Sequence, residues 1–131
     1  MTTSADPNEL DDLLAPYWST SRTMEALRLT ADGLAAARED GRVLGLKTSD
    51  GDYFYPVWTF VKAGENITVK PGVAVVLRAL RGLDGWTIGV FLRMGAPELD
   101  GLTPEEWIAQ QRDLEVLRDY AHVFAAEMRR P

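Results

Sequence analysis

Residues 44–60, LGLKTSDGDYFYPVWTF, decide the fold. Two runs rich in apolar and aromatic residues flank Asp50-Gly51, a pair whose members both accept the positive φ of a tight turn. Pro56 ends the second run because proline lacks the N–H that a strand needs. This pattern predicts a β-hairpin over residues 42–60.

Two short helices are predicted just before the hairpin. Small polar residues from Ser19 onward can cap a helix with Met24 and Leu27 on its apolar side, and Thr30 can cap a second helix over residues 31–39. Gly41 ends that helix. Two helices and then a hairpin is the order of a winged helix–turn–helix, which is predicted over residues 10–62. Residues 1–9 are predicted to form a flexible tail.

Helical periodicity returns after a polar, turn-like stretch at residues 61–70, where Ile67 and Val69 leave room for a short extended piece. Four helices are predicted, over residues 72–81, 84–94, 104–111 and 113–129. The third begins with Thr103 as N-cap, Pro104 at the first helical position and a glutamate at the third. The chain is thus predicted to be mostly α with a β-hairpin, ending in a small helical, partner-binding domain over residues 70–131.

Composition and charge exclude several classes of function. The 131 residues carry a net charge of −6, contain no cysteine and contain one histidine, His122, which excludes thiolate metal sites and a cysteine nucleophile. No serine or cysteine nucleophile stands at a useful spacing from that histidine, and no phosphate-binding glycine loop is present. We therefore expect no enzyme, no catalytic residue, no metal and no cofactor. Short apolar runs indicate a cytoplasmic protein without a membrane partner.

Residues 23–60 resemble the winged helix–turn–helix of excisionase- and MerR-like proteins. Residues 24–30 stand where these proteins carry the first helix and turn, Leu34 stands at a buried position of the recognition helix, and residues 39–43 (EDGRV) match the exit into the wing. The resemblance implies DNA contacts. The candidate DNA-binding residues are Arg28, Thr30, Asp32, Ala35, Ala36, Arg38, Arg42 and Lys47.

The sequence departs from the pattern of DNA-binding proteins at the positions that should contact DNA. Asp32, Ala35 and Ala36 hold the positions that should face the major groove, where arginine, lysine, asparagine or glutamine would read base edges. Residues 1–60 also hold ten acidic and five basic residues. We expect the monomer to bind DNA weakly or not at all, whereas a dimer would double the phosphate contacts.

A second resemblance covers the C-terminal half. The motifs that carry it are residues 44–46 (LGL), Asp50-Gly51, Tyr55-Pro56, residues 58–60 (WTF), Trp86, Phe91-Leu92 and residues 99–104 (LDGLTP). Together they are similar to the small bacterial Xre/ParS/MbcA-type antitoxins. That family implies binding of a RES-type toxin, whose active site the C-terminal helix or tail would block. The candidate partner-binding residues are Trp107, Leu117, Tyr120, Phe124, Arg129 and Arg130.

Other interpretations of the same residues stay open. The LDGLTP loop needs no partner, since glycine supplies a turn and Thr-Pro begins a helix. Trp107 is equally explained by burial. The chain could instead be a dimeric, sequence-specific transcriptional regulator of prophage or plasmid type, or a degenerate fold kept as a scaffold. A broad apolar stripe over residues 114–124 predicts association with a protein partner, with a second copy, or with both.

Overall fold

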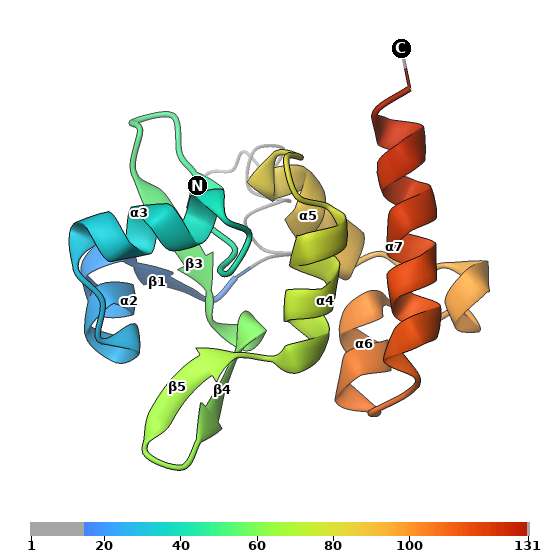
Figure 1. Cartoon of the computed structure of the whole chain (residues 1–131), viewed down its shortest axis with the longest axis horizontal. Helices are drawn as coiled ribbons and strands as arrows, with labels where there is room; N and C mark the ends of the chain where they lie inside the picture. The colour runs from blue at the N-terminus through green and yellow to red at the C-terminus, as the bar shows by residue number, and fades with distance from the viewer. Residues whose placement is uncertain (1–14, 131) are drawn as a thin grey trace, which may run out of the picture.

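The computed structural model describes residues 15–130 (Figure 1). A strand, two helices and a hairpin come first: β1 (Tyr17–Ser19), α2 (Thr20–Leu27), α3 (Ala31–Glu39), β2 (Leu46–Lys47) and β3 (Tyr53–Pro56). A 3-10 turn (Val57–Thr59) leads into a second hairpin, β4 (Phe60–Ala63) and β5 (Asn66–Val69). The helices α4 (Pro71–Ala79), α5 (Gly85–Leu92), α6 (Pro104–Ala109) and α7 (Leu114–Met128) complete the chain, with a 3-10 turn (Pro97–Leu99) before α6. The prediction of a mostly α fold with a β-hairpin is confirmed.

Side-chain caps explain where the first two helices begin. The Ser19 hydroxyl accepts a hydrogen bond from the backbone N–H of Arg22 (3.1 Å), and the Thr30 hydroxyl accepts one from the N–H of Gly33 (3.0 Å). Arg28, in the left-handed conformation at φ 59°, joins the two helices. The helix pair is therefore confirmed, with both caps where the sequence places them.

The predicted hairpin is the β2–β3 pair, with Leu46 opposite Phe54 and Lys47 opposite Tyr53. Its connection differs from the prediction: residues 48–52 form a five-residue loop, and of the Asp-Gly pair only Gly51 has a positive φ (91°). The sequence prediction also missed β1, which pairs with β3 to give the sheet order β1-β3-β2. A strand this short, followed at once by a helix, offers no alternation to detect.

The short extended piece allowed at Ile67 and Val69 is present as β5, but the rest of the predicted turn-like stretch 61–70 is wrong, because β4 pairs with β5 in a second hairpin. β4 and β5 are joined by the two residues Gly64 and Glu65, with Gly64 at φ 64°. Glycine at the first position of a two-residue connection suits the backbone twist of a hairpin. In Figure 1 this ribbon projects from the bottom of the molecule.

The four C-terminal helices are confirmed within two residues at each end. The capping box is present as expected, since the Thr103 hydroxyl accepts from the N–H of Glu106 (3.0 Å) and the Glu106 carboxylate accepts from the N–H of Thr103 (2.9 Å). Helix α7 packs lengthwise along α4 (Figure 1).

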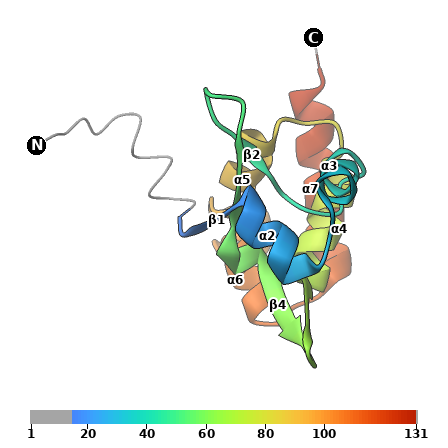
Figure 2. The same cartoon turned by 90° about the vertical axis from the view of Figure 1, so that its left-hand side faces the viewer.

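Two groups of buried side chains hold the fold together. The smaller lies under α3 and the sheet, where Leu34 and Tyr55 are fully buried. The larger lies among the C-terminal helices and also takes in Leu44 and Leu46 from the hairpin. The indole N–H of Trp86 on α5 donates to the Lys47 carbonyl (2.8 Å). The hairpin therefore links the two halves. Figure 2 looks from the side of α2 and α3, with the C-terminal helices behind them.

The joint between hairpin and α5 gives a stability prediction. A Cβ at Gly85 would overlap the carbonyl oxygen of Gly45. Gly85→Ala would therefore push the start of α5 away from the backbone of Gly45. We expect a loss of about 1–3 kcal/mol in the free energy of unfolding, measured by urea denaturation.

Gly51→Ala is the matched control, because a Cβ there meets nothing within 4 Å and only the positive φ opposes it. The expected cost is about 1 kcal/mol. If Gly85→Ala proves the milder change, the close approach of the two backbones is not a constraint.

Candidate functional site

A groove between α5 and α7 is the strongest candidate for a binding site. Its volume is about 480 Å³. The lining residues are Trp86, Thr87, Val90, Phe91, Met94, Gly95, Tyr120, Phe124 and Met128. None of these side chains is charged. An apolar groove without charges can bury apolar surface of a partner.

Helix α5 supplies one wall because it is apolar on every side. Asp84 caps it by accepting from the N–H of Thr87 (3.2 Å). Ile88, Phe91 and Leu92 are buried beneath it. A helix that is apolar all round cannot bury every side chain against one neighbour, so Trp86 and Val90 remain half-exposed at the surface.

Helix α7 supplies the other wall through a second stripe of side chains. Leu117, Ala121 and Ala125 recur every fourth residue and are buried in the core. Tyr120 and Phe124 lie beside them and contact the ring of Phe91. The Phe91 ring centroid lies 5.3 Å from that of Tyr120 and 4.7 Å from that of Phe124. These three rings form the floor of the groove.

Large apolar side chains stand exposed along the rim. Met94 is 56 % exposed, Met128 is 49 % exposed, and Val123, just outside the groove, is 58 % exposed. Methionine adapts its shape to many apolar surfaces, which suits a contact with another protein. Exposed apolar side chains gathered on one face, unlike single scattered ones, are typical of an interaction surface.

Tyr120 adds a polar group to this apolar setting. Burial raises the pKa of its phenol, and the negative charge of Glu98 raises that pKa further. The hydroxyl therefore keeps its proton at neutral pH and can donate a hydrogen bond to a docked partner.

The candidate partner-binding residues divide into three groups. Tyr120 and Phe124 line the groove, and their role in partner binding stays a prediction. Trp107 and Leu117 are corrections, because both are buried: the Trp107 indole donates to the Asp113 carbonyl (2.8 Å), and Leu117 is fully enclosed. Arg129 donates to the Arg81 carbonyl at the end of α4, and Arg130 is exposed beside it.

Sequence analysis missed the groove residues on α5 and at both rims. Trp86 and Val90 lie on a helix that is apolar all round, and such a helix gives no sign of which side stays uncovered. Met94 and Met128 follow the ends of periodic stretches and carry no pattern of their own. The one available signal was the excess of apolar positions over what four short helices can cover.

The candidate DNA-binding residues do not form a basic surface. Thr30 is used as a helix cap, and Asp32 and Ala36 are exposed, with Ala35 half-buried between them. Arg28 and Lys47 are exposed on separate elements. Arg42 pairs with Asp40 (3.2 Å). The exposed side of α3 therefore presents a carboxylate and methyl groups to any DNA.

The prediction that Arg38 contacts DNA is also corrected, because the Arg38 side chain stabilises the fold. Its guanidinium lies 3.8 Å from the centre of the Tyr53 ring and donates to the hydroxyl of the fully buried Tyr55 (2.7 Å). A guanidinium stacked on one ring and bonded to a second is held in place. Arg38 is thus turned toward the hairpin and away from the outer side of α3.

Residues 15–130 contain neither a metal-binding cluster of side chains nor a membrane-spanning helix. No group of three or more histidine, aspartate or glutamate side chains there could hold a metal ion. Within the same residues, no helix is both long and apolar enough to cross a membrane. The predicted tail and the segment Leu10–Leu14 lie outside the described residues.

Comparisons of the chain with protein families, with curated proteins and with solved structures find no match. The resemblances to antitoxins and to winged DNA-binding proteins therefore stay predictions.

The position of Arg38 can be tested by stability. Arg38→Ala leaves the buried Tyr55 hydroxyl without its partner, so we expect a loss of about 1–3 kcal/mol in the free energy of unfolding, measured by urea denaturation.

Arg42→Ala is the matched control, since that arginine has only an exposed ion pair and should change stability by less than about 0.5 kcal/mol. Equal effects of the two substitutions would show that Arg38 is a surface residue like Arg42.

Proposed function

We propose that this chain is an antitoxin-like or regulatory protein that binds and neutralises a partner toxin through its C-terminal helices. The observation that carries the proposal is the charge-free groove between α5 and α7, with Met94 and Met128 exposed on its rim. Such a surface gains free energy when a partner's apolar side chains remove it from water. The resemblance to Xre/ParS/MbcA-type antitoxins supplies the class of partner, a RES-type toxin in the cytoplasm.

The arrangement of α7 supports inhibition by occlusion. The same helix holds the core with its buried stripe and offers Tyr120 and Phe124 to the groove, so a docked partner would lie against a rigid element. Arg129 and Arg130 follow at the end of α7, where they can reach acidic groups of that partner. In this proposal, toxin binding requires no change in the fold.

The groove is tested by placing a charge on its rim. Met94→Glu and Met128→Glu would each have to bury a carboxylate when a partner docks, so we expect at least about a tenfold loss of affinity for the toxin. The measurement is co-purification and growth rescue on co-expression with a RES-type toxin encoded beside its gene.

His122→Glu is the matched control, because His122 is exposed on α7 outside the groove. Circular dichroism should show unchanged helix content in all three variants. Rescue by both groove variants at the level of the unchanged protein would place the contact elsewhere and overturn the proposal.

A dimeric transcriptional regulator is the second candidate, and one observation favours it. Strand β1 precedes the helix pair α2–α3 and pairs with β3 of the following hairpin, an arrangement that suits a winged helix. The acidic side of α3 opposes this candidate. The two features together favour a helix–turn–helix that has little affinity for DNA by itself.

Fluorescence anisotropy with labelled duplex DNA tests this second candidate. At physiological salt we expect binding no tighter than about micromolar, the range of non-specific contacts. Sequence-selective, nanomolar binding would contradict that expectation and favour the regulator. Arg42→Ala and Lys47→Ala would then identify the phosphate contacts.

A further inference from the structure

The outer edge of β4 is open in the described structure. β5 lies between β4 and α2, so β4 forms the free side of the two-stranded ribbon. The N–H of Lys70 donates to the Thr59 carbonyl (2.9 Å), a bond that flanks the Phe60–Val69 pair. Hydrogen-bonded and non-bonded pairs alternate along antiparallel strands, so Lys62–Ile67 is a non-bonded pair. The N–H and C=O of Lys62 therefore point away from β5.

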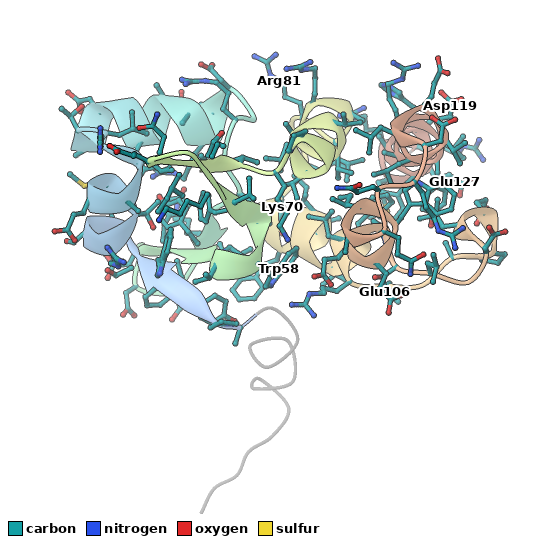
Figure 3. All side chains as sticks on the ribbon, turned by 90° about the horizontal axis from the view of Figure 1, so that it is seen from below. Trp58, Lys70, Arg81, Glu106, Asp119 and Glu127 are labelled. Carbon is teal, nitrogen blue, oxygen red and sulfur yellow. The ribbon has the colours of Figure 1, made fainter. Side chains whose placement is uncertain are left out.

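An apolar groove of about 450 Å³ lies beside this edge. It is lined by Val61 from β4, by Lys70, Pro71 and Gly72 at the start of α4, and by Ile108, Ala109, Gln111, Arg112 and Leu114 from α6 and the start of α7. Ile108 packs closely on Gly72: a Cβ added to Gly72 would lie 2.5 Å from the Cγ1 atom of Ile108. Val61 is 39 % exposed at one side of the groove. In Figure 3, Lys70 lies between the ribbon and α6.

The two charged residues that line this groove, Lys70 and Arg112, are basic, although the whole chain carries −6. Arg112 has a side chain that is 40 % exposed and pairs with Asp100 (3.3 Å). Lys62 adds a positive charge on the exposed strand, on the other face of the ribbon. Helix α4 begins here with no acidic residue in its first turn and no side-chain cap. The positive end of its dipole therefore also favours an acidic ligand.

The alternation of side chains along β4 defines the ligand further. Val61 faces the groove, and Lys62 points to the opposite face of the ribbon. We propose that an extended peptide with alternating apolar and acidic residues adds as a third strand along β4. Its apolar side chains would enter the groove over Ile108 and Leu114. Its acidic side chains would lie beside Lys62, and its backbone would bond to the free N–H and C=O of that residue.

Two other occupants fit less well. A second copy paired through β4 would bring Lys62 close to its own counterpart and would join two chains that each carry −6. A nucleic acid would place phosphates over Val61, Ile108 and Leu114, which offer no hydrogen bonds. The groove is also formed by the N-terminal end of α7, whereas the α5–α7 groove reaches its C-terminal end, so the two sites can be tested separately.

The test uses the full chain and a fluorescein-labelled heptapeptide of alternating aspartate and valine, DVDVDVD. We expect saturable binding by fluorescence anisotropy in the micromolar range. The lysine counterpart, KVKVKVK, should not bind. A version of the acidic peptide N-methylated at alternate residues should bind at least about tenfold more weakly, because it cannot complete the strand pairing.

Protein variants locate the site. Lys62→Pro removes the outward N–H, and Lys62→Glu reverses the charge; each should weaken binding at least about tenfold. Lys47→Glu, the same charge change on exposed β2, should not. Met128→Glu should also bind the peptide normally, which separates this site from the proposed function. Circular dichroism checks that the variants keep their fold.

Several outcomes would overturn the proposal. These are no saturable binding of the acidic peptide, equal binding of the lysine peptide, or equal losses from Lys47→Glu and Lys62→Glu. A dimer that Lys62→Glu dissociates would assign the edge to a second copy instead. Displacement of the peptide by random duplex DNA at physiological salt would assign it to nucleic acid.

Discussion

The close approach of two glycine backbones fixes how the two halves of the molecule meet. Gly85, at the start of α5, lies against the carbonyl of Gly45, and a side chain on Gly45 would come within 2.7 Å of Arg38 Cδ. Because neither position has a Cβ, α5 can sit directly on the hairpin while Arg38 packs over Tyr53 and Tyr55 on its other side. The α5–α7 groove is positioned by this joint, since α5 supplies one of its walls.

The charge distribution also follows from packing. Arg38, one of the arginines that the resemblance assigns to DNA contacts, instead satisfies the hydroxyl of a buried tyrosine. Arg42 is paired with its neighbour Asp40. What remains exposed on α3 is acidic or small. The exposed side of α3 therefore has the same sign as the net charge of the chain, whereas the charged residues that line the groove beside β4 are basic.

Sequence reasoning located the elements whose ends are fixed by local chemistry. The caps at Ser19, Thr30 and Thr103 and the four C-terminal helices depend on side chains within a few residues, so their positions follow from the sequence. β1 and the β4–β5 hairpin were missed because short strands show too few alternations, although Gly64 between two runs was a usable signal. Of the residues that line the α5–α7 groove, the sequence singled out only Tyr120 and Phe124 as partner-binding candidates. Burial of Trp107 and Leu117, and exposure of Met94 and Met128, depend on which helices meet, which no local pattern specifies.

The side chains of α7 divide into a buried stripe and an exposed set. Leu117, Ala121 and Ala125 hold the helix against the core, and the small alanines let it come close to α4. Met128 lines the α5–α7 groove, and Val116 and Val123 are exposed, so these three side chains contribute little to the core. Mutations at these exposed positions can accumulate without loss of the fold, whereas those in the buried stripe cannot. A lineage carrying this helix can therefore vary the side chains that α7 exposes to solvent while the scaffold stays constant.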